Sequence, residues 1–168
     1  MEYEAEFIVS QIYDKNKRYT ESEMSIEKKK LTFLKPDLES DIKIPYISHG
    51  VSAGFPSPAL DFMETSIDLN KTLIENPLAT FYVQVEGNSM IDAGIQDKDI
   101  LVVDRSIEPG NKKIAICLID GEFTVKRIKV EVDCLWLMPE NPSYSPIKVT
   151  EENQLIIWGI VTYVIKKL

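Results

Sequence analysis

The stretch KIAICLIDGEFTVKRIKV, residues 113–130, carries the clearest fold signal in the chain. Two apolar, β-prone runs flank the dipeptide Asp120-Gly121, which is a strong signal for a hairpin with a two-residue turn. Such a short turn leaves the two strands only one pairing register. The predicted register places Ile119 opposite Glu122, Cys117 opposite Thr124, and Ala115 opposite Lys126.

Strand-like segments continue on both sides of this hairpin. Before it, residues 79–85 alternate apolar and polar positions, and residues 100–103 form a short apolar run between polar turns. After it come residues 132–138 and 155–165. Six or seven strands joined by short turns predict a mostly β domain.

One helix is expected ahead of these strands. Asp68 suits the N-cap position of a helix over residues 69–76, and Pro77 would end it. Upstream, four prolines in residues 31–58 favour extended chain, and residues 50–58, GVSAGFPSP, read as a flexible linker. Residues 1–30 are polar and weakly patterned, which predicts a flexible or marginally helical extension.

Composition limits the classes of function. The net charge is −8 with a sequence pI of about 4.8, and neither the first 53 residues nor the remainder is basic. An acidic chain repels phosphate backbones, so direct specific DNA binding is not expected. Two cysteines and one histidine cannot build a zinc site, and we expect no metal or cofactor. Without a membrane-length apolar run or a signal peptide, the chain is expected to be cytoplasmic.

Ser89 is the candidate nucleophile. It lies in VEGNSMID, residues 85–92, where Gly87 and Asn88 break a β-prone run, and a serine on such a turn can be presented together with nearby backbone N–H groups. Gly-x-Ser is also common in ordinary turns. His49, the single histidine, lies in a polar Gly/Ser-rich stretch that suits a solvated loop, so any base for Ser89 is expected to be another residue.

Lys126 is the candidate base. The hairpin register places it in mid-strand on a semi-apolar face with Thr124 and Ile128, and with Cys117 on the diagonal. If this face is covered, loss of hydration would lower the pKa of the lysine, and a neutral amine can accept a proton from a serine. The alternative is a surface lysine whose stem lies along apolar neighbours.

The chain resembles the LexA/UmuD family of self-cleaving SOS proteins, peptidase family S24, from about Leu31 to its C-terminus. The matching motifs are GFPSPA (54–59), IDLN (67–70), GNSMID (87–92), DGEFTVK (120–126) and NPSYSPI (141–147). The first and fourth are closest to the UmuD branch. The resemblance implies a LexA/signal-peptidase-like β domain over residues 54–168, with one short helix and an extended, cleavable arm over residues 31–53.

The same resemblance implies site residues. Ser89 would be the nucleophile, Lys126 the general base and Ala53–Gly54 the scissile bond, with the backbone N–H groups of Ser89 and Met90 forming the oxyanion hole. The UmuD branch typically has Cys where this chain has Ala53, but a small residue is kept. An extension of about 30 residues precedes the resemblance, and its role is open.

The implied function is self-cleavage stimulated by a RecA–single-stranded DNA filament. The trimmed homodimer would then serve as accessory subunit of a UmuC-type Y-family DNA polymerase in translesion synthesis, with the sliding clamp as a further candidate partner. Two alternatives stay open at this point. One is a LexA-type transcriptional repressor inactivated by cleavage, which would need a DNA-binding head. The other is a non-catalytic β interaction module.

Overall fold

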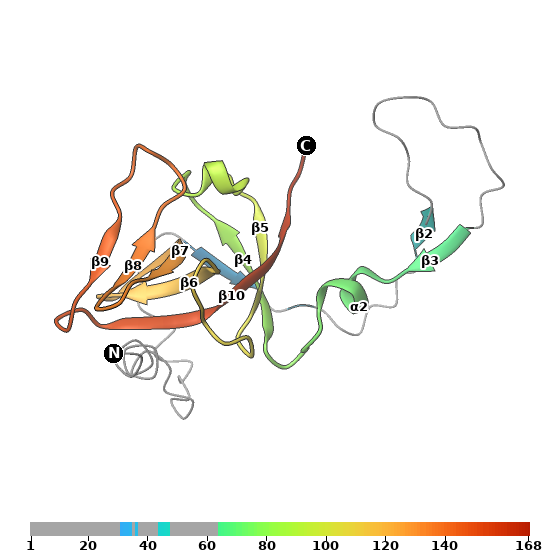
Figure 1. Ribbon diagram of the computed structural model, residues 1–168. Helices are drawn as coiled ribbons and strands as arrows, with labels where there is room; N and C mark the ends of the chain where they lie inside the picture. The colour runs from blue at the N-terminus through green and yellow to red at the C-terminus, as the bar shows by residue number, and fades with distance from the viewer. Residues whose placement is uncertain (1–30, 35, 37–43, 48–63) are drawn as a thin grey trace.

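The computed structural model describes residues 31–34, 36, 44–47 and 64–168, and within these residues the protein is mostly β, as predicted (Figure 1). Eight strands form one antiparallel sheet, and two more form a separate pair. In sheet order the eight are β1 (Leu31–Leu34), β4 (Thr80–Val85), β5 (Ile100–Asp104), β10 (Leu155–Ile165), β6 (Ile114–Ile119), β7 (Glu122–Val130), β8 (Leu135–Met138) and β9 (Ile147–Val149). The separate pair is β2 (Ile44–Ile47) with β3 (Glu64–Ile67).

The hairpin of β6 and β7 has the predicted register, with Ala115 opposite Lys126 and Cys117 opposite Thr124. Both turn residues have positive φ, 49° at Asp120 and 82° at Gly121, as a two-residue turn of this twist requires. The Asp120 carboxylate accepts hydrogen bonds from residues 153 and 154, just before β10. The turn therefore also fixes where the last strand enters the sheet.

Strands β6 and β7 are buried on both faces of the sheet. One apolar cluster draws side chains from β4, β5, β6, β7 and β10, and it includes Leu101, Ile116 and Val125. A second cluster collects the other face of β6 and β7 with β8, including Cys117 and Ile128. Since burying one such side chain contributes roughly 1.5–3 kcal/mol, β6 and β7 are held firmly from both sides.

Strand β10 joins two parts of the sheet: β1, β4 and β5 lie on one side of it, and β6, β7, β8 and β9 lie on the other. Its first half pairs with β6 and its second half with β5, with register shifts between Ile157 and Gly159 and between Val161 and Tyr163. A Cβ atom at Gly159 would lie 2.7 Å from Val103 Cγ1, so the close approach of β10 to β5 requires glycine here. β10 is the one strand of the sheet that is hydrogen-bonded to both parts.

The predicted helix is present but shorter than expected. Asp68 is its N-cap, with a side-chain oxygen accepting from the Asn70 N–H at 3.0 Å, and helix α2 spans Leu69–Leu73. The prediction that it reaches residue 76 was wrong. Ile74 is already extended, with φ −114° and ψ 97°, and its side chain is buried. Burial of this apolar side chain outweighs continuation of a helix that buries no residue of its own.

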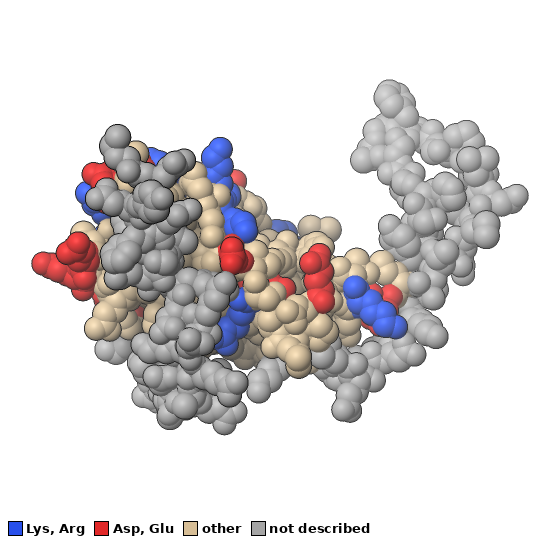
Figure 2. Space-filling model, turned by 60° about the horizontal axis from the view of Figure 1, so that its bottom comes forward, with Lys and Arg blue, Asp and Glu red and all other residues tan. Residues whose placement is uncertain are grey.

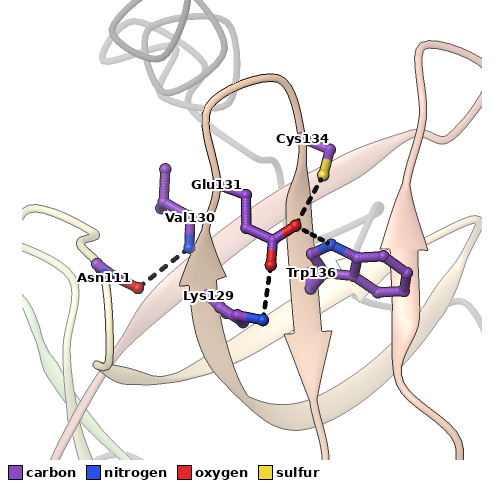
Figure 3. Close-up of polar contacts among 6 residues, drawn as sticks. All are labelled: Asn111, Lys129, Val130, Glu131, Cys134 and Trp136. Carbon is purple, nitrogen blue, oxygen red and sulfur yellow. Dashed lines mark hydrogen bonds and ion pairs between the residues drawn. The ribbon is translucent and has the colours of Figure 1, made fainter.

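The start of β8 differs from the prediction for a local reason. Residues 132–134 do not belong to β8, because the Glu131 N–H donates to the Cys134 carbonyl in a turn that leaves Val132 at its exposed tip. The Glu131 carboxylate accepts hydrogen bonds from Lys129, Trp136 and Cys134 around this turn (Figure 3). These contacts lower the pKa of Glu131, and the hydrogen bond from Lys129 has the largest effect. They also keep the turn closed.

Several sequence predictions fall outside the described residues. They are the character of residues 1–30, the position of His49, the linker over residues 50–58 and the bond between Ala53 and Gly54. Within the described ranges, no helix has the length and apolar character needed to cross a membrane.

Candidate active site

Ser89 follows β4 on a turn that is tied to the loop after it. Gly87 has φ 92°, a conformation that favours glycine, and its N–H donates to Asp97 Oδ1 at 2.8 Å. The Asn88 side chain accepts from the Asp97 N–H at 3.3 Å. The break predicted after β4 is therefore an ordered turn, and it holds the serine in a defined position.

A second segment supports the same turn from the other side. The Glu140 N–H donates to the Ser89 carbonyl at 2.9 Å, and Asn141 Nδ2 donates to the Asn88 carbonyl at 2.7 Å. Glu140 also forms an ion pair with Arg127 on β7, next to Lys126. The turn that carries Ser89 is thus connected to the strand that carries Lys126.

Little in the local sequence indicates these supporting contacts. Asn141 begins one of the motifs of the resemblance, but its contact with Asn88 spans 53 residues and was not predicted. Glu140 and Arg127 stand in no local pattern that indicates a pair. Only the general presence of polar residues before Pro142 signalled a structured loop.

Met90 anchors the far side of the turn. Its side chain is 2% exposed within the first apolar cluster, and its carbonyl accepts from the N–H groups of Ala93 and Ile95. The short 3₁₀ helix η2 (Ile91–Ala93) follows directly. Among the described residues, the N–H groups of Ser89 and Met90 donate to no protein acceptor. They are available to an oxygen atom placed beside the serine.

Lys126 is buried, with 6% of its surface exposed, and its amine lies beside Ser89. Nζ is 3.0 Å from Ser89 Oγ, 2.7 Å from Thr124 Oγ1 and 3.0 Å from the Val125 carbonyl oxygen. The structure thus brings together the two residues that sequence reasoning singled out. At this position the lysine is largely removed from solvent.

Cys117 contributes to the character of this site from the neighbouring strand. Burial raises the pKa of its thiol to about 12, and the positive charge of Lys126 only partly opposes that rise. Cys117 therefore stays a neutral thiol at physiological pH. It supplies no thiolate that would hold Lys126 in its charged form.

Ser89 and Lys126 line a cleft of about 490 Å³. Its walls are the end of β4 with the Ser89 turn, the hairpin end of β6 and β7, and the entry into β9, which contributes Tyr144, Ser145 and Ile147. Most of the lining residues are uncharged, and the charged ones are Glu86, Glu122 and Lys126. A cleft of this size accommodates several residues of an extended peptide.

The metal-ligating, basic and cysteine side chains of the described residues bear on three other kinds of site, namely metal, nucleic-acid and disulfide sites. Within the described residues, no three His, Cys, Asp or Glu side chains gather as metal ligands would. On the face shown in Figure 2, the Lys and Arg side chains of the described residues are scattered among neutral and acidic ones. Cys117 and Cys134 are both free thiols.

Comparison with known proteins identifies relatives over most of the chain. Residues 45–162 match the family model described as Peptidase S24-like. SamA of Salmonella typhimurium strain LT2 is 43% identical over 123 residues, covering 73% of this chain and 85% of SamA. ImpA of Salmonella typhimurium is 40% identical over 129 residues, covering 73% and 83%. The LexA repressor of Ectopseudomonas mendocina is 39% identical over 128 residues, covering 76% and 62%.

Proposed function

Because this chain belongs to the peptidase S24 family, we propose that it is a serine endopeptidase that cleaves its own Ala53–Gly54 bond. Ser89 is the nucleophile and Lys126 the general base in this proposal. The observation that carries it is the 3.0 Å separation of Lys126 Nζ from Ser89 Oγ at a buried position in the cleft. A nucleophile and base within hydrogen-bond reach are the first requirement of such chemistry.

The surroundings of Lys126 favour the role of a base. A neutral amine has two N–H groups and one lone pair. The Val125 carbonyl can only accept, and the Thr124 hydroxyl is placed to accept the second N–H, at 3.0 and 2.7 Å. This arrangement directs the lone pair toward the hydroxyl hydrogen of Ser89.

The proposed reaction then proceeds in two stages. Ser89 Oγ attacks the Ala53 carbonyl carbon while its proton passes to Lys126, and the N–H groups of Ser89 and Met90 donate to the developing oxyanion. The bond to Gly54 breaks as Lys126 returns the proton to the Gly54 amine. Lys126 then takes a proton from water, whose oxygen attacks the acyl carbon of Ala53. The bond to Ser89 Oγ breaks, Lys126 returns the proton to Oγ, and the new carboxylic acid on Ala53 ionises to a carboxylate.

The biological role that we propose follows the LexA/UmuD resemblance. A RecA–single-stranded DNA filament stimulates the cut, and the trimmed homodimer joins a UmuC-type Y-family DNA polymerase in translesion synthesis. The sliding clamp is a further candidate partner. The net charge of −8 argues against direct binding of DNA by this chain, and so supports a role through protein partners.

The test of this function is a cleavage assay on the purified chain. Incubation with RecA, ATP and single-stranded DNA is expected to yield two products whose masses place the cut between Ala53 and Gly54. Without RecA, raising the pH to about 10, near the ordinary pKa of lysine, is expected to speed the cut because it favours the neutral base. Ser89→Ala and Lys126→Ala should abolish both reactions, and a Ser89→Ala chain that still cuts itself would refute the proposal.

The LexA relative supports a second candidate, a transcriptional repressor inactivated by cleavage. The matched region covers 62% of that repressor, so part of the repressor has no counterpart in the alignment. An electrophoretic mobility shift with an SOS operator separates the two candidates. Specific binding by the uncut chain would favour the repressor over the polymerase accessory.

A further inference from the structure

The bond proposed for cleavage lies between two strands that pair with each other. β2 (Ile44–Ile47) precedes Ala53–Gly54 and β3 (Glu64–Ile67) follows it, and the two are antiparallel neighbours from Ile44 with Ile67 to Ile47 with Glu64. A cut at this bond breaks the covalent link. It leaves the backbone pairing of β2 with β3 in place.

A second pairing holds the same N-terminal segment to the main sheet. β1 (Leu31–Leu34) is the edge strand beside β4, with register from Leu31 opposite Val85 to Leu34 opposite Tyr82. β1 also precedes the proposed cut, whereas β4 follows it. In Figure 1, β1 (blue) lies within the main sheet, away from the pair of β2 and β3.

The side chain of Phe33 adds a packing contact to the backbone pairing of β1 with β4. Its ring lies 5.0 Å from that of Phe123, 5.5 Å from that of Trp158 and 5.7 Å from that of Phe81, measured between ring centroids. Phe33 packs against the first apolar cluster. One aromatic side chain of the N-terminal segment is therefore part of the core of the domain that follows the cut.

We propose that residues 1–53 remain bound to residues 54–168 after the cut, as a non-covalent two-chain protein. The occurrence of the cut in nature rests on the proposed function. The binding of the two fragments to each other rests instead on the two strand pairings and on the packing of Phe33. Both pairings belong to one fragment, so when one opens, the other keeps the fragment at high local concentration. Release of the arm is then a separate step from its cleavage.

The occupant of the β4 edge is thus the chain's own β1, both before and after cleavage. A strand at a sheet edge can be replaced by another extended segment that offers the same backbone pairing. Departure of β1 would leave unpaired backbone groups on β4 and uncover Phe81, Phe123 and Trp158. Those exposed groups make spontaneous release unfavourable.

The experiment separates binding from self-cleavage. A full-length Ser89→Ala chain receives the recognition site of a sequence-specific protease between Ala53 and Gly54, and that protease makes the cut. Size-exclusion chromatography in native buffer, followed by intact mass measurement of each peak, is expected to find both fragments in one peak at equal amounts. Denaturant should separate them.

Phe33→Ala and Leu34→Ala in the same chain form a matched pair of variants. Phe33 packs in the core, whereas the neighbouring Leu34 is 46% exposed. We expect Phe33→Ala to speed loss of the N-terminal fragment by about tenfold or more, equivalent to about 1.4 kcal/mol, and Leu34→Ala to change it little. Separate elution of the fragments with Phe33 intact would overturn the proposal, as would equal retention by Phe33→Ala. Neither result depends on whether the protein cuts itself.

Discussion

Replacement of Thr124 by valine tests how Lys126 is held beside Ser89. The Thr124 hydroxyl lies 2.7 Å from Lys126 Nζ, on the same face of β7. Valine keeps the β-branched shape and the preference for a strand, so the backbone of β7 should be unchanged. The substitution removes one hydrogen bond from the amine and little else.

The magnitude follows from that single hydrogen bond. A neutral hydrogen bond contributes about 0.5–1.5 kcal/mol net, which corresponds to a rate about 2- to 13-fold lower if the bond orients the base in the transition state. A hydroxyl that accepts from lysine also favours its charged form, so its removal should move the midpoint of the rate-against-pH curve to lower pH. The two effects oppose each other near neutral pH, and they separate on the alkaline plateau.

The assay is self-cleavage without RecA over a series of pH values, with Thr124→Ser as the matched control. Serine restores the hydroxyl, so this variant should recover most of the plateau rate. The orientation argument fails if Thr124→Val has the wild-type plateau and midpoint. It also fails if Thr124→Ser is as slow as Thr124→Val, because the hydroxyl would then not be the group that matters.

Three other outcomes can be measured directly. Because burial raises the pKa of Cys117 to about 12, iodoacetamide at pH 8 should alkylate the partly exposed Cys134 in the folded protein and leave Cys117 unmodified until denaturant is added, as peptide mass mapping would reveal. Gly159→Ala should lower the free energy of unfolding by about 1–3 kcal/mol, measured by urea denaturation, because its Cβ would meet Val103 at 2.7 Å. Asn141→Ala removes a hydrogen bond to the Ser89 turn and should slow cleavage by about 3- to 10-fold with little change in the unfolding midpoint; an unchanged cleavage rate would remove Asn141 from the support of the site.

The β hairpin could be predicted in full because its information is local. A two-residue turn at Asp120-Gly121 fixes the register, which places Ala115 opposite Lys126, and alternation along the strand puts Thr124 on the same face as Lys126. The Asp68 N-cap was likewise readable from neighbouring residues. Local patterns succeeded wherever the decisive interaction spans only a few residues.

The strands that were not predicted from the sequence depend on partners that are distant in the chain. β1 and β9 have four and three residues, too few for an alternating pattern, and each exists because another strand lies beside it. The helix ended early because burial of Ile74, a tertiary effect, prevailed over local helix preference. The candidate nucleophile and base were predicted, but the Glu140 and Asn141 contacts that position the serine were not.

The place of β10 in the sheet bears on when the site can form during synthesis. Ser89 follows β4 and Lys126 lies on β7, and β10 is the strand hydrogen-bonded to both parts of the sheet. A ribosome makes β10 after the other seven strands of that sheet. Until then the two halves of the sheet lack their shared strand, and the Ser89 turn is joined to the Lys126 strand only through contacts such as those of Glu140 with Ser89 and Arg127. Under the proposed function, we expect self-cleavage to reach its full rate only after β10 has been synthesised and has joined the two halves of the sheet.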